Sequence, residues 1–383
     1  MKILIIMGGF FPGQKYGGPP VSVDNFCSLL KEECDCFIVT CNHDMDNNNA
    51  YPNIHPGWND RGNCNVLYLS DKEYKYKTFE AVIKEISPDV IYLQGLFQYC
   101  VIPCLILAKK YNISVMLAPR GELCSGAFKK KYKKLPYIAF LKAFNLLKNV
   151  YFQATSDEES EAIKRILDAD KEKVHFMTNI PSIPKDRNIY VDKKEGQANL
   201  IFISRIVPKK NLHVALDFLK NVKGKVTFDI YGSLEDEQYW FECRKKIAEL
   251  PENIKVVYKG SVSHDEVHET FKRYDAFLFP TLSENFGHVI AEALMVGCPV
   301  IISDQTPWTD VNNIEGGWSI ALENSKKFVE AIQIIVNASP QEEHKYKENI
   351  LKYIYEKLDL QKLKYVYFEN FEKAIGMENK RYL

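Results

Sequence analysis

Short runs of apolar residues alternate along the chain with longer segments that have the spacing of amphipathic helices. Most runs are apolar without alternation, as in strands covered on both faces of a sheet. In the first half we predict strands over residues 2–7, 36–41, 66–69, 90–93, 114–118 and 150–153. In the second half we predict strands over residues 200–204, 227–231, 254–258, 276–279 and 299–303. This order of elements is typical of parallel α/β layers.

The alternation stops once, over residues 180–197, and then resumes. This segment is polar, contains Pro181 and Pro184, and has no sustained period. We interpret it as a linker or hinge. A chain of 383 residues is also too long for one ordinary core. The sequence therefore predicts an N-terminal domain of residues 1–185 and a C-terminal domain of residues 186–361.

The composition and charge of the chain argue against several kinds of function and localisation. Lys plus Arg and Asp plus Glu both count 50, so bulk charge gives no reason to expect a nucleic-acid partner. The apolar start before Gly8 is too short for a signal peptide, and no run approaches the roughly 20 residues of a membrane-spanning helix. We expect a cytoplasmic protein with reduced thiols. Cys34-Asp35-Cys36 and Cys41-Asn42-His43 flank an apolar run, so we favour strand-end packing over a metal site for both.

The most informative segment follows the predicted strand 276–279 and leads into a helix that should stop at Gly297. Ser283 or Asn285 can cap this helix. Exposed N–H groups at a helix start form an anion site at the carboxyl end of the preceding strand. Glu284 and Glu292 are two helical turns apart, so both carboxylates can face one side and accept hydrogen bonds from sugar hydroxyls. Taken alone, each also fits an ordinary solvated glutamate.

The whole segment resembles the E-x7-E signature of retaining GT-B glycosyltransferases of family 4. The matching residues are Ser283-Glu284-Asn285-Phe286-Gly287, Glu292-Ala293 and Gly297-Cys298-Pro299-Val300-Ile301. A second segment, Ser204-Arg205-Ile206-Val207-Pro208-Lys209-Lys210-Asn211, resembles the family's diphosphate-binding element. The resemblance implies an α/β GT-B fold, with two Rossmann-like domains facing across a cleft. It also implies that a C-terminal helix, about residues 362–383, crosses back to complete the N-terminal domain.

The resemblance assigns roles to individual residues. Arg205 and Lys210 would hold the donor diphosphate and, with Glu284, serve catalysis. The donor-binding set also includes Gly17, Gly18, Gly232, Asn285, Phe286, Gly287 and the ribose-binding Glu292. The implied reaction is a retaining, metal-independent transfer from a nucleotide sugar, with a UDP-sugar as the expected co-substrate and no bound cofactor or metal. A GT-B nucleotide-sugar epimerase and a degenerate GT-B interaction protein are the alternatives.

One departure from the family concerns the acceptor side. Residues 91–125 contain no histidine, although many members carry one near the reacting sugar. Ala118-Pro119-Arg120-Gly121 instead resembles an element of the subset that builds O-antigen, capsule and exopolysaccharide chains. We take Arg120, Glu122 and Gln94 as acceptor-side candidates, with a structural turn as the alternative. The subset implies a glycan or polyprenyl-diphosphate-linked saccharide as acceptor.

The run Lys129–Lys134 is the strongest local charge asymmetry in the sequence. Clustered lysines followed by aromatic and aliphatic residues can bind anionic lipid headgroups. The run therefore predicts a peripheral contact with the inner face of the cytoplasmic membrane. A simply solvated basic face is the alternative interpretation.

Overall fold

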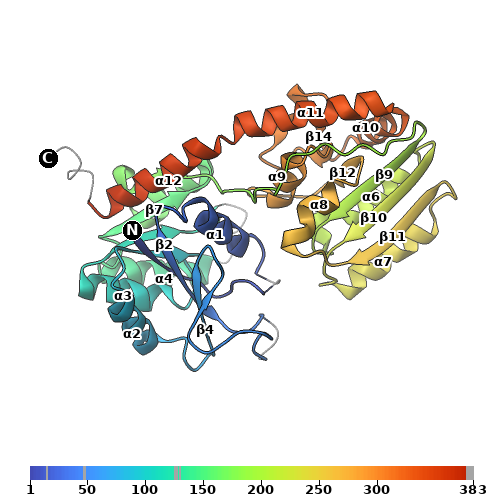
Figure 1. The fold of residues 1–383 in the computed structure, drawn as a ribbon. Coiled ribbons are helices and arrows are strands. Elements are labelled where there is room, and N and C mark those ends of the chain that lie inside the picture. Colours follow the sequence, from blue (N-terminus) through green and yellow to red (C-terminus); the bar gives the residue numbers. More distant parts are fainter. Residues whose placement is uncertain (14–15, 46–48, 125–127, 129–130, 377–383) are drawn as a thin grey trace. The chain divides into compact units, whose positions relative to one another are not determined.

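The computed structural model describes residues 1–376 except residues 14–15, 46–48, 125–127 and 129–130 (Figure 1). The chain forms two compact units. Unit 1 comprises Met1–Ile180 and the segment from Leu360, and unit 2 comprises Pro181–Asp359. The sequence places these boundaries after residues 185 and 361.

Unit 1 contains an eight-stranded sheet in the order β3-β4-β2-β1-β5-β6-β7-β8. Among the described strands of this sheet, only β3 is antiparallel to its neighbour. The strands are β1 (Lys2–Ile6), β2 (Asp35–Cys41), β3 (Trp58–Asp60), β4 (Asn65–Leu69), β5 (Val90–Gln94), β6 (Ser114–Ala118), β7 (Val150–Ala154) and β8 (Val174–Phe176). The sequence did not predict β3 and β8, because edge strands of three residues have no apolar run to mark them.

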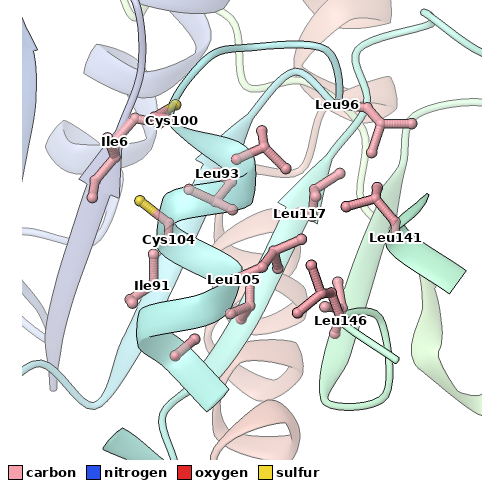
Figure 2. Packing of buried hydrophobic residues seen from close by; sticks show 14 of the residues in the cluster. Ile6, Ile91, Leu93, Leu96, Cys100, Cys104, Leu105, Leu117, Leu141 and Leu146 are labelled. Carbon is pink, nitrogen blue, oxygen red and sulfur yellow. The ribbon is translucent and has the colours of Figure 1, made fainter. Parts of the chain in front are cut away.

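Helices cover both faces of this sheet. They are α1 (Gly18–Leu29), α2 (Tyr76–Ile86), α3 (Val101–Tyr111), α4 (Lys131–Ala143), α5 (Asp157–Leu167) and α12 (Leu360–Ala374). On one face, side chains of α3 pack together with those of β5 and β6 (Figure 2). On the other face, the rings of Tyr367 and Phe371 lie 5.6 and 5.3 Å from that of Phe26. The C-terminal helix therefore returns to the first unit, as predicted.

Unit 2 contains a parallel six-stranded sheet in the order β11-β10-β9-β12-β13-β14. Its strands are β9 (Gln197–Ile203), β10 (Lys225–Tyr231), β11 (Ile254–Gly260), β12 (Ala276–Phe279), β13 (Val300–Ser303) and β14 (Gly317–Ile320). Its helices are α6 (Leu212–Leu219), α7 (Glu237–Ala248), α8 (Val267–Phe271), α9 (His288–Met295), α10 (Ser325–Asn337) and α11 (Pro340–Lys357). The strand order reverses between β9 and β12, and ligands of open α/β sheets bind at such a switch point.

The polar segment predicted as a linker is fixed to unit 2 over part of its length. The ammonium of Lys272 donates to Asp186 at 2.8 Å. The Arg187 guanidinium lies 3.6 Å from the centre of the Tyr355 ring. These two residues therefore belong to unit 2, and the hinge interpretation of the segment stays a prediction. Their partners lie far along the chain, where no local pattern points to them.

The lysine-rich run falls partly outside the described residues, which exclude residues 129–130 and the side chains of Lys131 and Lys133. Lys134 is described, and its ammonium donates to the Glu122 carbonyl oxygen at 3.0 Å. This lysine therefore fastens a loop and is not part of a simply solvated face. Across the described part of the chain, no helix combines the length and the apolar character needed to cross a bilayer.

Candidate active site

The predicted donor-binding residues of unit 2 follow β9, β10 and β12 at the carboxyl edge of its sheet, and Glu292 lies within α9. The loop after β9 and the loop after β12 are bonded to each other. The Leu282 N–H donates to the Lys209 carbonyl oxygen at 3.0 Å. The Asn211 side-chain amide donates to the Pro280 carbonyl oxygen at 2.9 Å. These bonds hold two loops, which come from separate motifs, at the switch point of the sheet.

Lys210 and Glu284 form an ion pair at this edge. Their side chains are only 12% and 14% exposed, so water screens the pair weakly. The Thr281 hydroxyl also donates to Glu284, at 3.3 Å. Burial lowers the pKa of Lys210, although Glu284 acts in the opposite direction. The structure thus brings together two residues that the sequence predicted from different motifs.

Arg205 lies on the same loop but is 44% exposed. Its guanidinium donates to Glu235 at 3.1 Å. Exposed ion pairs of this kind contribute only about 0–1 kcal/mol. A diphosphate could therefore draw Arg205 away from Glu235 at little cost.

Gly232 stands where β10 comes closest to the end of β9. A Cβ atom at this position would lie 1.7 Å from the Ser204 carbonyl oxygen, and φ is +143°. The Gly232 N–H also donates to the Gly260 carbonyl oxygen at 2.9 Å. The approach of the two strand ends therefore requires glycine here, before any ligand is considered.

Helix α9 begins at His288, and Gly287 is its N-cap with φ +76°. No side chain in the described part of the chain caps it, so the prediction of Ser283 or Asn285 as the cap is wrong. The left-handed turn at Gly287 starts the helix later than the sequence suggests. The Trp308 indole N–H donates to the Phe286 carbonyl oxygen at 2.5 Å and fixes this turn. The helix start remains suited to an anion.

Glu292 lies within α9 and is 5% exposed. The Ser182 hydroxyl donates to one of its carboxylate oxygens at 3.2 Å. The Nδ1 atom of His264 lies 3.7 Å from the same oxygen. Burial raises the pKa of the Glu292 carboxyl. Glu284 and Glu292 therefore have separate partners, and sequence reasoning missed both Ser182 and His264.

In unit 1, Arg120 and Gln94 meet at the carboxyl edge of the sheet. Arg120 has a left-handed backbone, with φ +55°. Its Nε atom donates to the Gln94 side-chain oxygen at 2.8 Å. One terminal nitrogen donates to the Asn179 side-chain oxygen at 2.5 Å. The pairing of two acceptor-side candidates was not visible in the sequence, because they follow different strands.

Glu122 faces the backbone of the loop after β5. It accepts hydrogen bonds from the N–H groups of Leu96 and Phe97 at 2.5 and 3.2 Å. Burial raises the pKa of its carboxyl. The structural-turn alternative accounts for these contacts, since the carboxylate satisfies backbone donors that would otherwise lack partners.

The predicted glycine pair lies at the start of α1. Gly17 is the N-cap with φ +70°, and Gly18 is the first helical residue. A Cβ atom at Gly17 would meet no atom of the described residues within 4 Å. Backbone conformation, and not crowding, therefore favours glycine at position 17.

Comparisons with known proteins agree with this geometry. Residues 184–353 match the family described as glycosyl transferases group 1. The O-antigen chain mannosyltransferase RfbU of Salmonella typhimurium is 24% identical over 208 residues, which are 51% of this chain and 56% of that protein. The capsular polysaccharide biosynthesis glycosyltransferase CapM of Staphylococcus aureus is 31% identical over 140 residues, 36% of each chain. The chain therefore matches about half of the Salmonella protein's length and about a third of the Staphylococcus protein's.

Among solved structures, Anabaena HepE in complex with UDP and glucose has a TM-score of 0.68 at 15% identity. The likeness covers 97% of this chain and 100% of that chain. At this identity the likeness establishes the fold, and the GT-B prediction is confirmed. The chain thus has the GT-B fold, and its residues 184–353 match glycosyl transferases group 1.

Proposed function

We propose that this protein is a retaining glycosyltransferase. It would move a sugar from a nucleotide sugar to a glycan or polyprenyl-diphosphate-linked saccharide in surface polysaccharide synthesis. The Lys210–Glu284 pair carries the proposal, because it places a shielded cation and a carboxylate at the sheet's switch point. The group 1 match covers both residues. Relatives named for O-antigen and capsule synthesis support the pathway.

The chemistry follows from the charges at this edge. Lys210, Arg205 and the start of α9 stabilise the diphosphate and the charge that grows as it leaves. The acceptor oxygen bonds to the anomeric carbon on the face from which the diphosphate departs, so the configuration is retained. The acceptor proton passes to the departing phosphate oxygen. The two side-chain cations serve where other transferases use a metal ion.

The remaining candidates orient the two substrates. Glu284 accepts hydrogen bonds from hydroxyls of the donor sugar, and Glu292 accepts them from the ribose. Asn285 is exposed beside Glu284 and is available to the same sugar. Arg120 and Gln94 of unit 1 contact the acceptor. Glu122 acts indirectly, by holding the loop after β5.

Nucleotide binding is the first test of this function. Thermal-shift screening against UDP, GDP, ADP, dTDP and their sugar conjugates should show one selective shift, with UDP-sugars as the expected class. A ligand at 100 times its Kd stabilises a protein by about 2.7 kcal/mol, which such a screen detects readily. The shift should disappear in Lys210→Ala and persist in Lys209→Ala, whose exposed side chain has the same charge. If no nucleotide or conjugate shifts the transition, the donor site is not where we place it.

Product analysis separates transfer from epimerisation. With donor and acceptor together, a transferase releases one nucleoside diphosphate for each sugar bond formed. An epimerase needs no acceptor and returns an isomeric nucleotide sugar without releasing the diphosphate. Detection of that isomer would replace the transferase proposal with the epimerase alternative.

We also propose that α4 contacts an anionic membrane at the cytoplasmic face. Its exposed residues include Tyr132 and Leu135, at 71% and 50% exposure, and Phe144, just beyond the helix end, is 59% exposed. Replacing the lysines at 129, 130, 131 and 133 by glutamine should reduce flotation with phosphatidylglycerol vesicles, because each basic residue contributes about 1 kcal/mol near such a surface. Lys134 is kept, since it fastens the loop at Glu122. Equal flotation of the variant and the original protein would exclude this contact.

A further inference from the structure

A cysteine, a histidine and an aspartate meet at the carboxyl edge of the unit 1 sheet. Cys41 is the last residue of β2, His43 follows two residues later, and Asp71 follows the neighbouring strand β4. One ligand atom from each residue lies within 4.8 Å of the other two. The proposed sugar transfer uses none of these three side chains. The sequence showed Cys41 and His43 but not Asp71, which depends on the pairing of β2 with β4.

The orientation of the histidine ring favours a shared cation. Nδ1 of His43 lies 2.9 Å from the carbonyl oxygen of Asp44, and a carbonyl only accepts, so Nδ1 carries a proton. Nε2 lies 3.0 Å from a carboxylate oxygen of Asp71. In the neutral ring, Nε2 would direct a lone pair toward that oxygen, which is repulsive. Either a second proton or a metal ion removes this repulsion.

The donor set distinguishes among metals. Thiolate, imidazole and carboxylate together suit Zn²⁺, whereas Mg²⁺ and Ca²⁺ prefer oxygen ligands alone. Zn²⁺ binds nitrogen and oxygen at about 2.0–2.2 Å in tetrahedral geometry, which sets these two ligand atoms roughly 3.3 Å apart. The 3.0 Å between His43 Nε2 and the Asp71 oxygen is close to this separation. The hydrogen bond from Nδ1 to a backbone carbonyl is a common support for a metal-binding histidine.

We propose that Cys41, His43 and Asp71 form a Zn²⁺ site with three protein ligands. The fourth position belongs to water. The Tyr16 hydroxyl donates to the His43 carbonyl oxygen at 2.9 Å, and Tyr16 directly precedes the glycine pair at the start of α1. Bound Zn²⁺ would therefore link the ends of β2 and β4, and the Tyr16 hydrogen bond joins the same segment to the start of α1. This site takes no part in the proposed sugar transfer, and all three of its protein ligands belong to unit 1.

Cobalt provides a spectroscopic test of this site. Tag-free, chelator-treated full-length protein is titrated with Co²⁺ and then with Zn²⁺. We expect one equivalent of Co²⁺ to give a thiolate-to-cobalt charge-transfer band, which Zn²⁺ then displaces. Cys41→Ser should lose the band. Asp71→Asn should weaken Co²⁺ binding at least about 10-fold, since losing an outer-shell partner alone costs 10–100-fold. Cys124→Ser, which changes another half-buried cysteine, should keep the band.

The competing account is an imidazolium–carboxylate pair between His43 and Asp71, with no metal. This account predicts that Co²⁺ gives no thiolate-to-cobalt charge-transfer band, or that the Asp71→Asn variant binds Co²⁺ with the affinity of the original protein. Either result would overturn the proposal, as would a band that survives Cys41→Ser. The Asp71 side chain is 71% exposed, so we expect the Asp71→Asn variant to fold. This variant therefore tests the proposal even if the Cys41→Ser variant does not fold. Circular dichroism checks the fold of each variant.

Discussion

Replacing Lys210 by alanine should lower kcat/KM for sugar transfer by about 10²–10³-fold, the loss seen when one charge-stabilising donor is removed from an active site. The ammonium of Lys210 is held by Glu284, and its side chain is only 12% exposed. The substitution removes a cation that would offset the charge on the departing diphosphate. It also leaves Glu284 without its ionic partner. Initial rates over a range of donor concentrations separate the change in kcat from the change in KM.

Lys209→Ala is the matched control for this substitution. Lys209 lies on the same turn with an exposed side chain, and its carbonyl oxygen keeps its bond to the Leu282 N–H in the variant. The Lys209→Ala substitution should therefore leave kcat for sugar transfer unchanged. A Lys210→Ala enzyme that recovers its full rate at saturating donor would show that Lys210 contributes to binding only. That result would contradict the proposed stabilisation of the leaving group.

Lys347→Met should lower the free energy of unfolding of unit 2 by about 3–5 kcal/mol, because removing one partner of a buried ion pair leaves an uncompensated charge. Lys347 and Glu343 are 2.8 Å apart on α11, and both side chains are 3% exposed. A second buried pair, Lys193 and Asp275, lies 3.6 Å apart, and its charges interact electrostatically with those of the first pair. The Lys347 ammonium also donates to the Tyr190 carbonyl oxygen at 2.6 Å, so the substitution removes this bond as well.

Tryptophan fluorescence can follow the unfolding of unit 2 separately. Trp58 is the single tryptophan of unit 1, and the other three are Trp240, Trp308 and Trp318 of unit 2. In a Trp58→Phe background, a urea titration therefore reports on unit 2 alone. Lys345→Met changes an exposed lysine of the same helix, paired with Glu315 at 2.7 Å, and should alter stability far less. Equal effects of the two substitutions would contradict the special role of the buried pair.

The loss of stability in Lys347→Met should also depend on pH. Burial raises the pKa of the Glu343 carboxyl above its ordinary value of 4.5, and Lys347 opposes this shift. Without Lys347 the folded-state pKa rises further. A carboxyl with a raised folded-state pKa stabilises the fold below the unfolded-state pKa and loses that contribution as the pH rises through the folded-state value. The cost of the substitution should therefore be smallest below about pH 4.5 and grow toward neutral pH. The double variant Lys347→Met/Glu343→Leu should recover much of the stability.

The fold was largely readable from the sequence, because most strands are buried and therefore continuously apolar. The predicted strand 276–279 coincides with β12. The three unpredicted strands, β3, β8 and β14, have only three or four residues each and lie at sheet edges. An edge strand of this length is determined by its neighbour, and its own residues carry little pattern.

The candidate site was predictable only where its residues fall within one motif. Lys210 and Glu284 were each found in this way, but their pairing depends on the adjacency of β9 and β12 in the sheet. Ser182 was assigned to a linker, although its hydroxyl bonds to Glu292. The burial of Glu292 was equally hidden, since a glutamate within a helix pattern is usually solvated. Contacts between distant segments decide these features, and local residue patterns do not encode them.

The return of α12 to unit 1 has a consequence for biosynthesis. The ribosome makes residues 1–180 before unit 2, yet the face of their core near Phe26 is completed by Tyr367 and Phe371, which are made after unit 2. Unit 2 is continuous and has all its residues before then. Folding during translation must therefore finish in the reverse of the order of synthesis. Until α12 has left the ribosome, the nascent first unit exposes an aromatic surface to chaperones, and premature termination before Leu360 leaves that surface permanently uncovered.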